Sequence, residues 1–399
     1  MKLLEEYRLP CGAILKNRIA KAAMTERLSD KSGKANDYHT GLYSQWAATD
    51  VGLLITGNIM VDRRYKESSG NIVLENDKGL DELKKLTSSV TSQGKHLWAQ
   101  ISHAGRQATI FSTFKPIAPS VVKLKKLGLF AKPRAMTKGE IEDVIRRFVS
   151  TAVLCKKAGF TGVQIHAAHG YLLSQFLSGH TNKRTDEYGG SIENRSKVLL
   201  EIVSKARQEL GKDFPISVKL NSADFQRGGF DEEDAGFVIK RLEELSVDLL
   251  EISGGTYENI VFLTKRIKRE STQKREAYFL DFAQKIRKNT NLPLMVTGGF
   301  RSLDFCNEVL ENNDLDVIGF ARPFLIDKEF PNSLIERKVD RIEDAKFLFK
   351  PRKMADMAEA GYYDYQIRRL AENKELKPNY SPYVGINRFL INEIKKGWF

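Results

Sequence analysis

Short apolar segments rich in β-branched residues alternate with longer amphipathic segments along most of the chain, and this alternation restricts the fold more than any other feature. The short segments predict eight strands, at residues 18–23, 52–56, 97–102, 162–166, 215–220, 249–253, 293–297 and 316–320. Strands that alternate with helices form parallel sheets with right-handed crossovers. Eight such units favour an α/β fold, the closed (β/α)8 TIM barrel, with an open doubly wound sheet as the alternative.

The longer segments carry helix signals. Residues 141–153 place apolar side chains at i, i+3, i+4 and i+7, which predicts one buried helix face. Thr137 and Glu140 form a T-x-x-E capping box in front of this segment. Asp231 is the expected N-cap of a later helix.

The chain has 399 residues, and the eight strand–helix units use most of them. We therefore predict a single barrel domain over residues 1–338 and a C-terminal extension, residues 339–399, that packs on the barrel. The third connection, residues 102–138, is long and contains three prolines. Connections of this length are usually functional loops.

Composition excludes several classes of protein. A hydrophobic share of 41% and a charged share of 29% are typical of globular proteins rather than disordered ones. No apolar run reaches the roughly 18 residues of a membrane span, and the first residues lack an apolar signal region. Three widely spaced cysteines exclude a disulfide framework and CxxC metal sites. We expect a cytoplasmic protein with no metal and no membrane partner.

The net charge of +13 raises nucleic acid as a partner. The excess includes runs at residues 123–134, 265–275 and 350–353, and none of them alternates with aromatic residues as a base-stacking surface would. We interpret the charge as a solvated basic surface and expect no nucleic-acid partner, with a basic nucleic-acid-binding protein as the alternative.

The most informative motif is HAAHGY, residues 166–171, at the end of the fourth predicted strand. His166 and His169 are spaced to lie on one side of a helical turn. Neutral imidazoles can hold and polarise a carbonyl oxygen, and the hydroxyl of Tyr171 can deliver a proton. The alternatives are two structural histidines or a zinc site, and the motif lacks a third zinc ligand.

Other predicted strands end in small or polar residues that suit a flat ligand. Small side chains allow close approach, and amides offer both donors and acceptors. A lysine inside an apolar strand needs an anion unless its stem reaches solvent. Because a barrel places its site at the carboxyl ends of its strands, we expect these residues to share one site. They are Ala22, Ala23, Met24 and Thr25 at the end of strand one, Thr56-Gly57-Asn58 at the end of strand two, Gln100 in strand three and Lys219 in strand five.

The last two predicted strands are followed by glycine and arginine, in GGFR (residues 298–301) and GFARP (residues 319–323). Backbone N–H groups of glycine-rich turns together with arginine bind phosphate, and barrels often build a phosphate site at these two loops. No GxGxxG or P-loop motif follows any predicted strand. A phosphorylated, flat cofactor at the barrel mouth is therefore expected, and FMN is the natural candidate.

At these same positions the chain resembles the Old Yellow Enzyme family of flavin oxidoreductases, from about residue 15 to residue 327. The motifs that carry the resemblance are LKNRI (15–19), the Ala-Met-Thr turn (23–25), WAQISHAGRQ (98–107), HAAHGYLLSQFLS (166–178) and DEYGGSIENR (186–195). The resemblance implies an NAD(P)H-dependent flavin oxidoreductase with non-covalent FMN, with NADH or NADPH as reductant. Its implied substrates are small activated alkenes, namely enones and nitro compounds.

The resemblance also implies residue roles. Flavin N5 gives hydride to the alkene β-carbon, His166 and His169 hold the substrate oxygen, and Tyr171 protonates the α-carbon. Arg27 is a further implied substrate contact. Thr25 is implied to lie near flavin O4 and Lys219 near the pyrimidine edge. The implied FMN-binding residues are Ala22, Ala23, Met24, Thr25, Asn58, Gln100, Lys219, Gly298, Gly299, Phe300, Ala321 and Arg322.

The chain departs from the common family pattern at several of these positions. Ala23 replaces a frequent proline, Ala321 a frequent glycine, and Lys219 a frequent arginine, which keeps the charge but loses the bidentate fork. Family members form monomers, dimers and tetramers, so a homodimer or larger homo-oligomer is open. The alternative enzyme class is a phosphate-binding barrel isomerase or aldolase that uses Lys219.

Overall fold

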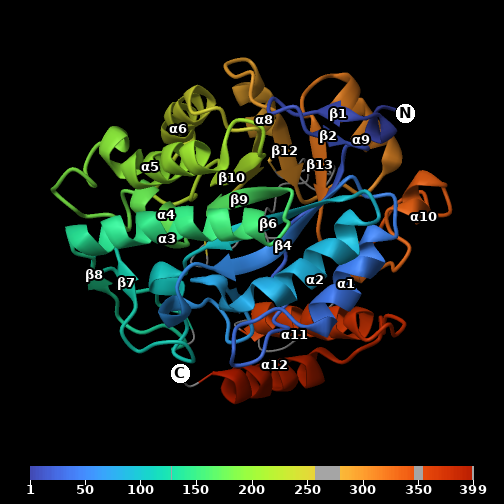
Figure 1. Cartoon of the computed structure of the whole chain (residues 1–399), viewed down its shortest axis with the longest axis horizontal. Helices are drawn as coiled ribbons and strands as arrows, with labels where there is room; N and C mark the ends of the chain where they lie inside the picture. The colour runs from blue at the N-terminus through green and yellow to red at the C-terminus, as the bar shows by residue number, and fades with distance from the viewer. Residues whose placement is uncertain (127, 257–278, 346–353, 398–399) are drawn as a thin grey trace.

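Eight parallel strands close into a barrel in the computed structural model, which describes residues 1–126, 128–256, 279–345 and 354–397 (Figure 1). The barrel closes because the last strand, β13, pairs with the first, β3, and β3 also pairs with β4. In order, the strands are β3 (Ile19–Lys21), β4 (Leu53–Met60), β6 (His96–Ser102), β9 (Gly162–Ala167), β10 (Ile216–Asn221), β11 (Leu249–Ser253), β12 (Leu294–Thr297) and β13 (Val317–Phe320). The predicted (β/α)8 TIM barrel is confirmed, and each predicted strand overlaps one of these.

One predicted strand end is wrong. The second strand was predicted to end at residue 56, but β4 continues through Gly57 and Asn58 to Met60. A register irregularity between Ile55 and Asn58 lets β4 keep its pairing with β6. Thr56 accepts a hydrogen bond from the backbone N–H of Gln100 (3.1 Å), so its polar side chain is satisfied inside the sheet.

Helices cover the outside of the barrel. The predicted caps are confirmed: Thr137 and Glu140 form the capping box of α3, and Asp231 accepts from the N–H groups of Glu233 and Asp234 in α6. The described helices are α1 (Asp37–Ala47), α2 (Leu80–Thr91), α3 (Lys138–Lys157), α4 (Leu172–Leu177), α5 (Ile192–Leu210), α6 (Glu232–Glu244), α8 (Leu280–Arg287), α9 (Leu303–Glu311), α10 (Asn332–Ile335), α11 (Ala355–Ala371) and α12 (Pro382–Lys396).

A short hairpin closes the amino-terminal end of the barrel. Its strands, β1 (Tyr7–Arg8) and β2 (Ile14–Leu15), pair antiparallel. Leu9 and Leu15 pack in one buried cluster with Trp98, Met295 and other inward-facing strand residues. The larger buried cluster lies between the strands and the helices. Since the hairpin fills one end, the opposite end, where the strands finish, is left for a ligand.

The connections at that opposite end contain short additional strands. β5 (Ile72–Val73) pairs with the extended end of β4. The long third connection contains β7 (Ile117–Ala118) and β8 (Arg134–Ala135), which pair with each other. Both connections lie at the carboxyl ends of β4 and β6, so they add walls to the barrel mouth.

The two C-terminal helices lie side by side at one flank of the barrel (Figure 1). α11 packs against α1 and α12 packs against α11. The backbones of α11 and α12 meet at two glycines, since a Cβ added to Gly361 would lie 2.4 Å from the carbonyl carbon and oxygen of Gly385. The absence of a side chain at Gly361 therefore sets the distance between the two helices.

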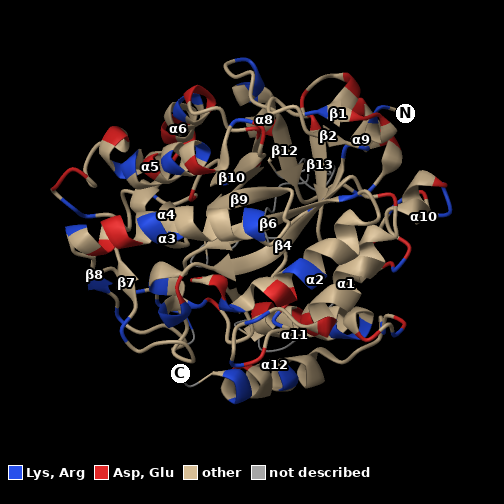
Figure 2. Cartoon of the chain, viewed as in Figure 1, with Lys and Arg blue, Asp and Glu red and all other residues tan. Residues whose placement is uncertain are grey.

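Charged residues of both signs are interspersed over the outer helices, while the barrel strands are mainly uncharged (Figure 2). The basic runs at residues 265–275 and 350–353 lie outside the described residues. Among the described residues, no helix is both long and apolar enough to span a membrane.

We predict that Gly361→Ala separates α12 from α11. The added methyl overlaps the backbone of Gly385, and such overpacking costs about 1–3 kcal/mol of unfolding free energy. Amide hydrogen exchange should speed up in residues 382–396 more than in the barrel strands. The matched control is Gly139→Ala in α3, where a Cβ meets nothing within 4 Å. Equal exchange in α12 of both variants would show that the close contact does not set the spacing.

Candidate active site

The carboxyl ends of the barrel strands open into one cavity of about 390 Å³. The cavity gathers residues that the sequence placed after seven different strands, as expected for a barrel site. Of the predicted site residues, those that line it are Ala23, Met24, Thr25, Arg27, Asn58, Gln100, His166, His169, Tyr171, Lys219, Gly298, Gly299, Ala321 and Arg322.

Two predicted residues do not line the cavity. Ala22 and Phe300 are both fully buried. Ala22 belongs to the cluster inside the barrel, and Phe300 packs against Phe305 and Phe320. Their side chains therefore support the wall of the cavity from behind.

The two histidines lie together, but not on a helical turn. His166 is in β9, and His169 follows it with φ of 60°, in the left-handed region. The ring centroids are 5.2 Å apart, and the ring of Tyr171 lies 4.8 Å from that of His166. The left-handed residue turns the chain sharply after the strand, which brings three side chains to one wall within six residues.

Both imidazoles are neutral at physiological pH. Burial, and then the positive charge of Lys219, holds the pKa of His166 and His169 well below 6.5. The backbone N–H of Ala168 donates to Nδ1 of His166 (3.3 Å), so the proton of this ring is on Nε2. Nε2 of His169 lies 2.6 Å from Oγ of Ser253. The Nε2–H of His166 is therefore a hydrogen-bond donor that the contact with the backbone of Ala168 does not use.

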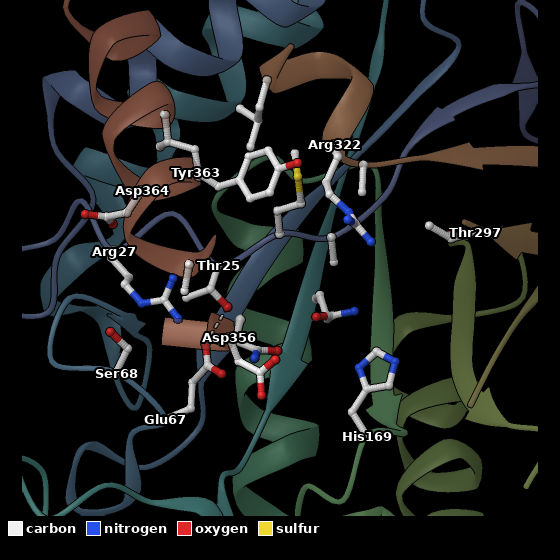
Figure 3. A pocket seen from close by; sticks show the side chains of 18 of the residues that line it. Thr25, Arg27, Glu67, Ser68, His169, Thr297, Arg322, Asp356, Tyr363 and Asp364 are labelled. Atoms are coloured by element: carbon white, nitrogen blue, oxygen red, sulfur yellow. Dashed lines mark hydrogen bonds between the residues drawn. The ribbon is translucent and has the colours of Figure 1, made fainter. Parts of the chain in front are cut away.

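A carboxylate that the sequence did not indicate joins two predicted site residues. Glu67 lies between η2 (Arg63–Tyr65) and β5 and is 7% exposed. The hydroxyl of Thr25 donates to Oε1 of Glu67, and the phenol of Tyr171 donates to Oε2. Figure 3 shows Thr25 and Glu67 pointing toward each other on one side of the cavity, with Arg322 and His169 on the other side.

The floor of the cavity is a layer of buried polar side chains inside the barrel. Lys219 in β10 forms an ion pair with Glu251 in β11 (2.8 Å), and the two residues are direct neighbours in the strand register. Glu251 also accepts from Gln164 (2.9 Å) and Thr297 (2.7 Å). Gln100 donates to Gln164 (2.7 Å), which extends the network to β6. Sequence reasoning identified Lys219 and Gln100 but missed their partners.

The other end of the cavity is suited to a phosphate. Gly298 and Gly299 have φ of 107° and 93°, a conformation that side chains rarely adopt. Arg322, at the start of η5 (Arg322–Leu325), lines the same region. Arg301, the other arginine of these loops, forms an ion pair with Asp344 (2.6 Å). Both arginines line the cavity, and Arg322 is the one that the family resemblance implies at the phosphate.

Glu359 of α11 contacts this arginine. Its Oε1 lies 3.0 Å from Nη1 of Arg322, and its side chain is 12% exposed. Burial raises the pKa of Glu359 from 4.5 to about 7, and the Arg322 charge only partly opposes this. Arg322 lines the cavity and Glu359 does not, so a ligand phosphate at Arg322 would share the guanidinium with this carboxylate.

The C-terminal helices close one side of the cavity. Tyr363 and Asp364 of α11 and Phe389, Leu390 and Glu393 of α12 line it. The guanidinium of Arg27 lies over the ring of Phe389, 5.1 Å from its centroid. Sequence reasoning gave this extension no role in the site, because its residues lie far from any predicted strand end.

These side chains fit a flat, phosphorylated cofactor such as FMN. A glycine turn and Arg322 suit an anion at one end, and Lys219 lies as a cation at the floor. Oδ1 of Asn58 is buried in the wall and has no hydrogen-bond partner within the described part of the chain. Fold and site together define the class: a (β/α)8 barrel that binds a phosphorylated cofactor beside two neutral histidines and a tyrosine.

Comparison with known proteins identifies the family. A sequence model of the NADH:flavin oxidoreductase / NADH oxidase family matches residues 12–340. The chain is 34% identical over 332 residues to an NADH oxidase of Thermoanaerobacter brockii, covering 82% of this chain and 50% of that protein. It is 35% identical over 340 residues to the NADH-dependent flavin oxidoreductase nadA of Aspergillus parasiticus, covering 81% and 76%. The chain thus spans about half the length of the bacterial relative.

A solved structure agrees with the fold. The Old Yellow Enzyme homologue from Zymomonas mobilis superposes with a TM-score of 0.74 at 24% identity, covering 88% of this chain and 98% of that one. The chain belongs to the NADH:flavin oxidoreductase / NADH oxidase family, and the predicted relationship to Old Yellow Enzyme is confirmed. FMN is the cofactor of this family, and NADH is the reductant named for both relatives.

We predict that Glu359 makes the FMN-free protein less stable as pH rises. Because its pKa is raised in the folded state, its contribution to stability is complete below about pH 4.5 and is lost as pH rises through about 7. Glu359→Gln should remove this loss, which is about 3 kcal/mol at most. Urea unfolding between pH 4.5 and 8 measures it.

Glu372→Gln, at the C-terminal end of α11, is the control for this experiment. Lys374 lowers the pKa of Glu372, so its contribution to stability has the opposite sign and is lost only at low pH. The control should keep the wild-type loss of stability between pH 4.5 and 8. The same slope in wild type and Glu359→Gln would show that the Glu359 carboxyl is not the group that titrates.

Proposed function

We propose that this protein uses NADH or NADPH to reduce activated alkenes, namely enones and nitro compounds. The observation that carries the proposal is the cluster of two neutral imidazoles and a phenol on one wall of the cavity, opposite a cation-lined phosphate end. FMN, when bound, supplies the hydride for the alkene β-carbon. The protein must then hold the substrate oxygen and deliver a proton.

His166 and His169 are the proposed holders of the substrate oxygen. A neutral imidazole donates one hydrogen bond without carrying charge into the cavity, and a buried donor polarises a carbonyl or nitro oxygen more strongly than water does. Since Nδ1 of His166 accepts from the backbone, its Nε2–H is the donor that remains for the substrate. Polarisation draws electron density from the β-carbon, which makes that carbon the better hydride acceptor.

Tyr171 is the proposed proton donor for the α-carbon. Its ring packs against His166, so a substrate oxygen on the histidines brings the α-carbon near the phenol. The side chain is buried, at 4% exposed, which excludes bulk water from competing for the same position. Arg27, on the same side of the cavity as Thr25, is the proposed further substrate contact (Figure 3).

The proposed cofactor contacts follow the shape of the cavity. Thr25 and Asn58 face the ring system, Gln100 and Lys219 its floor, and Gly298, Gly299, Ala321 and Arg322 the phosphate. Ala22 and Phe300 support these positions from behind. Lys219 contributes positive charge, but its ion pair with Glu251 offsets part of it. Lys219 should therefore stabilise the anionic reduced flavin less than a cation without a carboxylate partner would.

The same ion pair argues against the aldolase alternative. A Schiff-base lysine needs a free amine that can reach the substrate carbonyl, and the amine of Lys219 is held in an ion pair with Glu251 at 2.8 Å. Failure to trap a covalent adduct at Lys219 with borohydride would remove this alternative. Charges of both signs are interspersed over the outer helices in the view of Figure 2, which argues against one continuous basic face on this side of the described residues.

We expect the purified protein to be yellow and to lose its flavin absorbance with NADH or NADPH under anaerobic conditions. Adding an enone such as cyclohexenone should restore the absorbance, because both half-reactions use the one cavity. Stopped-flow absorbance with each nicotinamide measures the first step and with enones the second. A colourless protein that FMN cannot reconstitute would contradict the proposal.

We predict that Tyr171→Phe keeps flavin reduction by the nicotinamide but slows re-oxidation by an enone by about 10²–10⁴-fold. The phenol gives a proton only in the second half-reaction, so only that step should suffer. Tyr188→Phe is the control, because Tyr188 is also buried but does not line the cavity. Equal slowing of both half-reactions in Tyr171→Phe would contradict the proton-donor role.

A further inference from the structure

Glu67 is the one carboxylate in the described structure that accepts from both Thr25 and Tyr171. Oε1 accepts from the Thr25 hydroxyl and Oε2 from the Tyr171 phenol. Nδ2 of Asn71 also donates to Oε1 (3.3 Å), which fixes the carboxylate in place. Glu67 is 7% exposed, so water competes little for these positions.

Each of these two hydroxyl groups has a single hydrogen. A threonine or tyrosine hydroxyl can donate that hydrogen in one direction at a time, whereas an ionised carboxylate only accepts. Hydrogen bonds to a carboxylate are roughly twice as strong as those between neutral groups. Glu67 therefore takes both hydrogens in preference to a neutral carbonyl oxygen of a cofactor or substrate.

We propose that Glu67 is a positioning residue that holds the hydroxyl hydrogens of Thr25 and Tyr171 away from the cofactor and the substrate. By doing so it lowers the reduction potential of the bound flavin and makes the phenol of Tyr171 harder to deprotonate, so that the proton stays on Tyr171 until the substrate α-carbon can accept it. The inference rests on the proposed function for the roles of these two residues, but the hydrogen bonds themselves are independent of it.

At Thr25 the consequence concerns the cofactor. A hydroxyl that donates to a flavin oxygen stabilises the negative charge of the reduced state. While Glu67 holds that hydrogen, this stabilisation of the reduced state is absent. The negative charge of Glu67 near the flavin also disfavours the reduced state, so both effects lower the reduction potential. Removing Glu67 returns the hydrogen to the cavity, so the flavin should become easier to reduce.

At Tyr171 the consequence concerns the phenol, and Glu67→Gln isolates it. Asn71 donates toward the Oε1 position, so the amide oxygen of the glutamine stays there and continues to accept from Thr25. The amide nitrogen then takes the Oε2 position and donates to the phenol oxygen. The phenol hydrogen is released toward the cavity, and Tyr171 ionises more readily because an acceptor with negative charge has become a neutral donor.

The first experiment follows Tyr171 by NMR of the full chain, as purified, with ¹³C at Cζ of its tyrosines. Tyr171→Phe assigns the signal. We expect Tyr171 to ionise at lower pH in Glu67→Gln than in wild type. The control is Glu75→Gln, which removes a carboxylate of the same β4–β6 connection that pairs with Arg63 and Arg147 outside the cavity, and it should change nothing. Ionisation at the same pH in wild type and Glu67→Gln would overturn the proposal.

The second experiment measures the flavin midpoint potential in wild type, Thr25→Ala, Glu67→Ala and the double variant, each loaded with FMN. If Glu67 acts on the flavin only through its charge, its removal should raise the potential equally with and without the Thr25 hydroxyl. If its removal also releases the Thr25 hydrogen toward the flavin, the rise should be larger when Thr25 is present. We expect Glu67→Ala to raise the potential more when Thr25 is present. Equal shifts in wild type and in the Thr25→Ala background would overturn the Thr25 half of the proposal.

Glu67→Gln is the control for this experiment, because it removes the negative charge of Glu67 but keeps an acceptor for the Thr25 hydroxyl. Because its amide oxygen still accepts from Thr25, it should raise the potential by the same amount in wild type and in the Thr25→Ala background. A larger shift with Thr25 present would contradict the assigned amide orientation. Failure of the alkene-reductase proposal would appear as absent FMN binding or turnover. Failure of this inference would appear in the tyrosine titration, which needs no turnover.

Discussion

The ion pair of Lys219 and Glu251, enclosed in the barrel, is the interaction on which the rest of the site depends. The two side chains are 6% and 0% exposed, so both charges have lost their water. Such a pair is tolerated only where further hydrogen bonds satisfy it, and here Gln164 and Thr297 both donate to Glu251. Removing one partner of a buried pair costs about 3–5 kcal/mol, because the other charge is left uncompensated. The floor of the cavity is thus fixed by interactions on neighbouring strands.

This floor also determines the state of the wall above it. Lys219 adds to burial in keeping the two histidines neutral, so they can donate hydrogen bonds without repelling a reductant or substrate. The negative charge of Glu251 in turn offsets the positive charge of Lys219, so the electrostatic potential in the cavity is less positive than Lys219 alone would make it. The result is a wall of neutral donors above a compensated charge, which suits polarisation of an oxygen better than binding of an anion.

The sequence predicted the barrel and most of the cavity because both follow the same rule: the chemistry lies where parallel strands end. It missed Glu251 although the signal was present. A charged residue inside the apolar run Leu249–Ser253 needs a partner of opposite charge, as Lys219 does in its own strand. Glu67 gave no signal, because it follows Arg63, Arg64 and Lys66 in a segment that looks like an ordinary charged loop. Partners of this kind depend on tertiary approach, and no local pattern encodes them.

Lys219 and Arg322, the two cations expected to face the cofactor, are each already paired with a carboxylate, and the two pairs differ in their position relative to the cavity. Glu251 lies inside the barrel, beneath Lys219, and no ligand at the mouth can replace it. Glu359 comes from α11 and contacts Arg322, which lines the cavity, while Glu359 itself lies behind the lining. Because its pKa is near 7, Glu359 can take up a proton rather than remain as a second anion beside the phosphate. The pair at the floor is therefore enclosed within the barrel, while the pair at the phosphate end joins an arginine of the cavity lining to a titratable carboxylate that the C-terminal extension supplies.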